Sequence, residues 1–156
     1  MDEKEITITT TQLAKFLNIE YSRLDVWLKK NIFLLDNPLP GKGYTRQFDF
    51  NDVIAAGVAS EVMKWTRGFD IARNTVELFR NDPNKKRWFS IVISHIEDKY
   101  KISWGGFGKR ELKESDIIFI DEENLTRSLI IIPVPEITKK VEKLFNKLKT
   151  EVKKES

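Results

Sequence analysis

The order of signals in residues 9–79 is the feature that most limits what this chain can fold into. Thr9 followed by Gln12 is a capping box, in which each side chain satisfies a free backbone N–H group at a helix start. The residues that follow supply one apolar helix face: Leu13, Ala14, Phe16 and Leu17. The sequence therefore predicts a short amphipathic helix directly after Thr9.

A second short helix is predicted over residues 21–30. Residues 18–20 are too few for a strand, and Leu24, Trp27 and Leu28 recur at helical spacing. Two such helices joined by a tight turn pack steeply, which leaves the second with one buried stripe and one outward face. The expected outward side chains are Tyr21, Ser22, Arg23, Asp25, Lys29 and Lys30.

A loop between two strands, forming a wing, is expected next. Asn31 tolerates the left-handed conformation that ends a helix, and residues 32–35 have the apolar character of a short buried strand. Proline and glycine residues at 38–43 then force a loop. Tyr44, Arg46 and Phe48 follow with the alternation of a strand.

Two further helices complete the predicted N-terminal domain, residues 1–80. Asp49 is expected to cap the third helix and Gly68 to end it, while Asp70 caps the fourth. The expected inward residues of the two helices are Val53, Ile54, Val58, Val62, Ile71, Val76 and Phe79. Four helices and one wing would close a compact core.

The first half of the chain thus contains a series of short motifs in a definite order: Leu13-Ala14-Lys15, Leu24, Trp27, Arg46-Gln47-Phe48 with Asp52-Val53, and Arg67-Gly68-Phe69-Asp70. Together they resemble the DNA-binding domain of MerR-like transcription regulators and the related excisionases. The resemblance implies a winged helix-turn-helix dimer whose second helix enters the major groove of double-stranded DNA. It also implies that the wing contacts the sugar-phosphate backbone and that the third and fourth helices act as a second wing.

The candidate DNA contacts combine the outward face of the second helix with the wing and the third-helix end: Tyr21, Ser22, Arg23, Lys29, Lys30, Lys42, Tyr44, Arg46 and Arg67. Asp25 departs from the family, which usually carries arginine there. An acid at that place repels phosphate unless it accepts a hydrogen bond from a cytosine amino group. For Arg46 a phosphate contact is favoured, and the alternative is an ion pair with Asp49 or Asp52 that pins the wing.

Charge supports this interpretation only locally. The chain has a net charge of +3, but residues 1–80 hold 11 Lys and Arg against 11 Asp and Glu. Residues 21–46 are different, because five cations there face only Asp25 and Asp36. A basic face is therefore expected around the second helix and the wing, although a few cations on a solvated surface are the alternative.

Other classes of protein are excluded or disfavoured by composition. The absence of cysteine excludes disulfides and the thiolate sensing of soft metals known in metal-responsive MerR-like proteins. The apolar runs fall short of the roughly 20 residues that a membrane helix needs, so a cytoplasmic protein without a membrane partner is expected. No cofactor or metal site is predicted, and any small-molecule effector is left unidentified.

The second half, residues 87–150, is predicted to be a small antiparallel sheet with a C-terminal helix. Residues 82–86 are linker-like, and strands are expected at 88–96, 100–104, 117–120 and 129–134. The final helix is expected to begin after Pro135 and to fray from Thr150. Its seam has coiled-coil spacing and could serve a dimer or the chain's own sheet equally well: Ile137, Val141, Leu144 and Leu148.

No enzyme motif is found. His95 is the only histidine, and no cysteine or carboxylate stands near it at motif spacing. The run Gly105-Gly106-Phe107-Gly108-Lys109 continues with Arg110 where a phosphate-binding loop needs Ser or Thr. The aromatic residues of the sheet are assigned to the core rather than to a ligand pocket: Trp88, Phe89, Tyr100, Trp104 and Phe107.

The sequence as a whole predicts an α+β protein that is not an enzyme. The leading hypothesis is a dimeric, sequence-selective transcription regulator of MerR-like type that binds double-stranded DNA. One alternative is an excisionase-like architectural factor that bends DNA. A second alternative is a winged-helix module that binds a protein instead of DNA.

Overall fold

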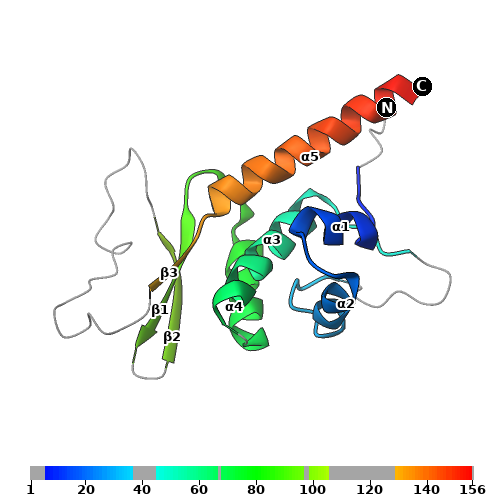
Figure 1. The fold of residues 1–156 in the computed structure, drawn as a ribbon. Helices are drawn as coiled ribbons and strands as arrows, with labels where there is room; N and C mark the ends of the chain where they lie inside the picture. The colour runs from blue at the N-terminus through cyan, green and yellow to red at the C-terminus, as the bar shows by residue number, and fades with distance from the viewer. Residues whose placement is uncertain (1–5, 37–44, 67, 97–98, 106–128, 156) are drawn as a thin grey trace.

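The computed structural model describes residues 6–36, 45–66, 68–96, 99–105 and 129–155. The described helices are α1 (Thr10–Leu17), α2 (Tyr21–Lys29), α3 (Phe50–Trp65), α4 (Phe69–Asn81), the short 3₁₀ helix η1 (Pro83–Arg87) and α5 (Val134–Glu155). The described strands are β1 (Ser90–Ile96), β2 (Lys99–Gly105) and β3 (Leu129–Ile132). In Figure 1, the sheet lies on one side of α3 and α4, and α1 and α2 lie on the other side. The predicted α+β class is confirmed.

The first two helices form as the sequence predicts. The Thr9 hydroxyl accepts from the Gln12 N–H at 3.3 Å, and the Thr9 N–H donates to the Gln12 side chain at 2.8 Å. Asn18 ends α1 in the left-handed conformation, with φ of 55°. The predicted stripe of α2 is buried, with Leu24, Trp27 and Leu28 at most 3% exposed.

The strand predicted at residues 32–35 is wrong. Asn31 and Leu34 both adopt positive φ, 49° and 52°, which an extended strand does not allow. The Asn31 side chain accepts the Leu35 N–H at 3.0 Å, which replaces a strand hydrogen bond. Ile32 and Phe33 are both fully buried, so consecutive rather than alternate side chains enter the core. The apolar run is a core-filling turn.

Phe48, expected at the end of the second wing strand, pairs with Ile8 of the N-terminal segment. Phe48 and Ile8 exchange backbone hydrogen bonds of 2.9 Å and 2.9 Å and form an isolated antiparallel bridge. Both side chains are fully buried. The predicted wing loop and Tyr44 lie outside the described residues, so the wing itself stays a prediction.

The start of α3 is confirmed, but the α3–α4 junction differs from the prediction. The Asp49 carboxylate accepts the Asp52 N–H at 2.8 Å, and the Asp52 carboxylate accepts the Asp49 N–H at 3.1 Å. Helix α3 ends at Trp65, so Gly68 does not end it but serves as the N-cap of α4. Asp70 is therefore not a cap. It lies in the first turn of α4, where a negative charge suits the helix dipole.

The sheet has the order β2-β1-β3 with both neighbours antiparallel to β1. In register, Ile93 pairs with Ile102 of β2, and Ile91 pairs with Ile132 of β3. The first two predicted strands and the fourth are confirmed within a few residues, while the strand predicted at 117–120 lies outside the described residues. Of the aromatic residues, Trp104 is buried as predicted. The core assignment is wrong for Trp88 and Tyr100, which are 73% and 46% exposed.

The segment predicted as a linker after α4 is the helix η1, which contacts both α3 and α5. Lys86 Nζ donates to the Asn51 side chain at 3.1 Å and lies 5.2 Å from the Phe50 ring centroid. The Thr138 hydroxyl contacts the Lys86 carbonyl oxygen at 3.4 Å. Burial lowers the pKa of Lys86, and the neighbouring Arg87 charge lowers it further. Helix η1 thus ties the start of α3 to α5.

Helix α5 packs mainly on α3, whereas the intrachain arrangement considered for it was packing on the sheet; the other arrangement, a dimer contact, stays a prediction. Ile137, Val141 and Phe145 are buried, and the Phe145 ring meets Phe50 of α3 edge to face at 5.4 Å between centroids. The helix begins at Val134 and not after Pro135. Proline is tolerated there because the N–H groups in the first turn of a helix have no partner within the helix. It continues to Glu155, so the predicted fraying from Thr150 is wrong.

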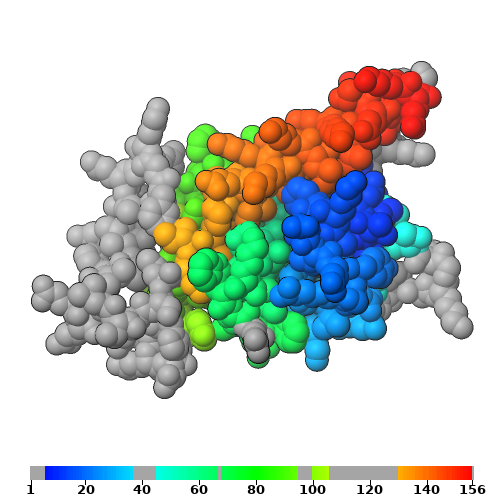
Figure 2. All heavy atoms as spheres, in the orientation of Figure 1, coloured from blue at the N-terminus to red at the C-terminus, as the bar shows by residue number. Residues whose placement is uncertain are grey.

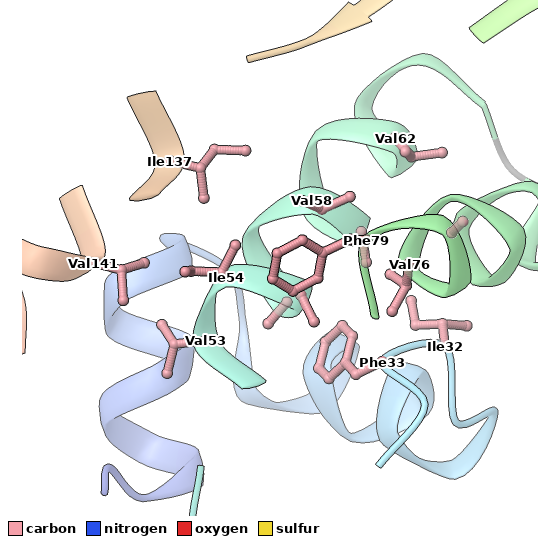
Figure 3. Packing of buried hydrophobic residues seen from close by; sticks show 14 of the residues in the cluster. Ile32, Phe33, Val53, Ile54, Val58, Val62, Val76, Phe79, Ile137 and Val141 are labelled. Atoms are coloured by element: carbon pink, nitrogen blue, oxygen red, sulfur yellow. The ribbon is translucent and has the colours of Figure 1, made fainter. Parts of the chain in front are cut away.

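Helix α3 is the centre of one continuous apolar core. Its residues from Val53 to Ser60 are all buried. Figure 3 shows Ile137 and Val141 of α5 on one side of α3, and Phe33, Val76 and Phe79 on another. The core therefore joins the two halves of the chain, while the division into domains 1–80 and 87–150 stays a prediction.

Gly57 allows the close approach of α3 and α5. A Cβ atom on Gly57 would lie 2.7 Å from Cγ2 of Ile137, well inside contact distance. We expect Gly57→Ala to lower the free energy of unfolding by about 1–3 kcal/mol through overpacking. Glycine to alanine in a helix interior otherwise stabilises by about 1 kcal/mol.

Denaturant unfolding of a double-mutant cycle checks this expectation. In an Ile137→Ala background, which removes Cγ2, Gly57→Ala should become neutral or stabilising. A stabilising effect of Gly57→Ala in the otherwise unchanged chain would contradict the close packing.

Candidate nucleic-acid interface

Helix α2 presents an exposed face opposite its buried stripe. With about 3.6 residues per turn, Ser22, Val26 and Lys29 lie opposite Leu24, Trp27 and Leu28. Ser22 and Lys29 are exposed, and Val26 is 46% exposed. Tyr21, also exposed, and Arg23 flank this face. The predicted exposure is confirmed for Tyr21, Ser22, Arg23, Lys29 and Lys30, while Asp25 is only partly exposed. In Figure 2, α1 and α2 (blue) lie at the surface below α5 (orange to red).

Arg23 and Lys29 of α2 and Lys30, which caps its C-terminus, each lie near another side chain. The Arg23 guanidinium lies 5.3 Å from the Trp27 ring centroid, and Lys30 Nζ lies 5.9 Å from that of Phe69. Lys29 Nζ pairs with Asp25 at 2.9 Å. Such contacts restrict long side chains without removing their charge, so these cations remain available to an anionic partner.

Asp25, the departure from the MerR-like pattern, is compensated within the protein. Its carboxylate lies 2.9 Å from Lys29 Nζ and 3.7 Å from an Arg46 nitrogen. The hydrogen bond from Lys29 is the main cause that lowers the pKa of Asp25; burial acts in the opposite direction, and the Lys29 and Arg46 charges lower the pKa further. Its charge is thus shared with two cations, which weakens the repulsion expected between an acid here and phosphate.

Arg46 lies at this interface but with a partner that the sequence did not indicate. The alternative considered for it was an ion pair with Asp49 or Asp52. Asp52 pairs with Arg80 at 2.9 Å, and the alternative stays a prediction. Arg46 lies 3.7 Å from Asp25 of α2, and its side chain is only 17% exposed. Arg46 therefore links the described end of the predicted wing to α2. The candidates Lys42, Tyr44 and Arg67 lie outside the described residues.

Two arginines of α4 position the end of α2, and sequence reasoning missed both. Arg73 donates to the Lys30 carbonyl oxygen at 2.7 Å. Arg80 donates to the Phe33 carbonyl oxygen from two nitrogens, at 3.1 and 2.8 Å. Their spacing of seven on one helix places them on the same face of α4, which was the available signal. These contacts satisfy carbonyl groups of the turn after α2 and fix the turn against α4.

Arg80 also pairs with Asp52 of the α3 capping box, at 2.9 Å. Burial raises the pKa of Asp52, and the nearby Asp49 charge adds to this effect. The Asp49 backbone N–H and the Arg80 guanidinium act in the opposite direction without overcoming it. The raised pKa means that the folded protein binds a proton at Asp52 more readily than the unfolded chain does. The contribution of Asp52 to the free energy of unfolding therefore increases as the pH falls through its folded pKa.

Comparisons with known proteins do not assign a class. No protein-family model matches the sequence, and no curated protein matches it. Within the described ranges, His, Asp and Glu side chains do not form a group of three or more that could hold a metal ion. None of the described helices has the length and apolar character that crossing a membrane requires.

Replacing Asp25 tests the electrostatics of this face. Because Asp25→Asn releases Lys29 and Arg46 from their shared carboxylate, we expect tighter binding to duplex DNA of any sequence. The log–log salt dependence should steepen by up to about 0.9 for each new phosphate contact. Arg46→Ala should flatten it, and fluorescence anisotropy over a salt series measures both.

The two variants have opposite expected signs, so each is the other's control. A loss of affinity in Asp25→Asn confined to sites with one particular cytosine would contradict the compensation and support direct base contact by Asp25.

Proposed function

We propose that this protein is a sequence-selective binder of double-stranded DNA that reads the major groove with α2. The observation that carries the proposal is the face of α2, whose polar and cationic side chains are exposed while Leu24, Trp27 and Leu28 are buried. A two-helix unit with a tight turn and such a second helix is a common device for major-groove reading. Within this proposal the protein is a MerR-like transcription regulator.

The contacts that hold α2 in place favour a role for this helix in reading DNA. Arg73 and Arg80 hold the turn after α2, and Trp27 anchors its middle in the core. Base recognition needs side chains held in a fixed orientation, because each base pair offers a fixed pattern of donors and acceptors. The fixed position of α2 is therefore suited to selective contacts.

Dimer formation is part of the proposal. One short helix buries little surface and discriminates weakly, so two copies on an inverted repeat would supply the missing affinity. The first part of the α5 seam is buried within the chain, which leaves Leu144 and Leu148, both only partly buried, as the available part of it. Leu144→Glu with Leu148→Glu is expected to weaken association in sedimentation equilibrium.

Selection of bound fragments from random duplex DNA tests the function. An enriched inverted repeat with half-site centres about one helical turn apart, or a multiple of it, supports a dimeric regulator. A degenerate but bent set of sites favours an excisionase-like architectural role, and no enrichment favours a protein partner. Ser22→Ala and Arg23→Ala should then change base preference at particular positions, by about 1–3 kcal/mol per well-formed contact.

A further inference from the structure

Val26 is the one apolar residue on the outward stripe of α2 and is 46% exposed. Ser22 stands one turn before it and Lys29 one turn after it, so its neighbours along the stripe are polar. A β-branched residue at an exposed helix position lowers helix stability relative to alanine. Local helix formation therefore gives no reason for valine here. A single exposed apolar residue is ordinary on most surfaces, but this one lies at the centre of the proposed reading face.

We propose that Val26 reads the C5-methyl group of thymine and so sets a T·A preference at one base pair of each half-site. This inference rests on the proposed DNA binding. The thymine methyl is the apolar group that base edges present in the major groove, where the other groups are hydrogen-bond donors and acceptors. Valine offers methyl groups and no hydrogen bond, so it complements that methyl group and leaves the polar groups of a G·C edge without partners.

The position of Val26 along the helix fixes which base pair it reads relative to its neighbours. A rise of about 1.5 Å per residue puts Ser22 roughly 6 Å before Val26 and Lys29 roughly 4.5 Å after it. These spacings are about one to two base-pair steps of roughly 3.4 Å. The thymine therefore lies between the base pairs or phosphates that Ser22 and Lys29 reach, in the interior of each half-site.

The polar residues beside Val26 sharpen this assignment. Lys29 is held by Asp25 at 2.9 Å, which keeps its ammonium group beside the stripe. Val26 thus stands between a small hydroxyl-bearing residue and a held ammonium group. A partner that fits must offer an apolar group flanked by polar and anionic groups, and a thymine methyl between base edges and phosphates does so.

Substituting uracil for thymine tests the contact, because uracil lacks only the C5-methyl group. On the selected site, each thymine of the half-site is replaced in turn and affinity is measured by fluorescence anisotropy. One interior thymine should be sensitive, with binding about fourfold weaker on uracil, the effect of one buried methyl group. Val26→Ala should bind the thymine site about as weakly as the wild type binds the uracil site, and should not discriminate between the two. Val152→Ala, which truncates an exposed valine of α5 in the same way, is the matched control, and it should keep both the affinity and the discrimination.

The outcomes separate the inference from the function on which it rests. Selective binding without a uracil-sensitive interior thymine overturns the role of Val26 and leaves DNA binding intact. Equal sensitivity in Val26→Ala and the wild type assigns the methyl contact to another residue and likewise overturns it. Failure to bind any duplex overturns both. Thermal unfolding should show Val26→Ala to be folded, since the substitution is at an exposed helix position.

Discussion

Replacing Trp27 with alanine is expected to lower the free energy of unfolding by roughly 3–5 kcal/mol, the cost of truncating a large buried aromatic residue. Trp27 is 3% exposed, and its ring meets Phe33 edge to face at 6.4 Å between centroids. Arg23 packs over the same ring. The truncation therefore removes the support of α2 and of the turn after it together, and binding through α2 should be lost with stability.

Equilibrium denaturant unfolding followed by circular dichroism measures this effect. Trp65→Ala is the matched control, because Trp65 is 69% exposed and its truncation should change stability by no more than about 0.5 kcal/mol. Similar losses for the two variants would mean that Trp27 is not a core residue. A folded Trp27→Ala protein with full stability would be inconsistent with the position of α2.

Replacing Val141 with aspartate should destabilise the whole chain, by about 4 kcal/mol or more at neutral pH. Val141 is fully buried where α5 covers α3, so a carboxylate there would be removed from solvent. Because burial raises the pKa of a carboxyl group, the penalty should shrink as the pH falls and the group becomes protonated. The core is continuous through α3, so α1 and α2 should lose protection as well.

The same substitution elsewhere on α5 provides the control. Val152 is 60% exposed, and Val152→Asp should leave stability nearly unchanged. Hydrogen exchange read by mass spectrometry reports on each helix separately. If Val141→Asp loosened α5 alone while α1 to α4 kept their protection, the two halves of the chain would be independent folding units.

Local sequence was sufficient wherever neighbours along the chain determine the structure. The capping boxes at Thr9 and Asp49, the buried stripe of α2 and the hairpin of β1 with β2 depend on contacts a few residues apart. The exposure of the α2 face follows from the same periodicity. The predicted DNA-contact residues on α2 were therefore correctly expected to be exposed, although their binding to DNA remains a proposal.

Residues 32–35 show where local pattern was insufficient. An apolar run of four fits a buried strand and a core-filling turn equally well, because periodicity cannot separate them at that length. The turn is selected by Arg80, 47 positions away, which satisfies the Phe33 carbonyl oxygen. The junction before α4 was similarly ambiguous, since both Gly68 and Asp70 are common helix-boundary residues.

The sequence by itself determined helices α1 to α5, the caps at Thr9 and Asp49 and the outward face of α2, since each of these depends on residues within one or two helical turns. Only the tertiary structure decided that Arg46 also meets Asp25, and that α5 covers α3 through Gly57. Those contacts join segments far apart in the chain. Their partners are chosen by shape and charge in three dimensions, which spacing along the sequence does not encode.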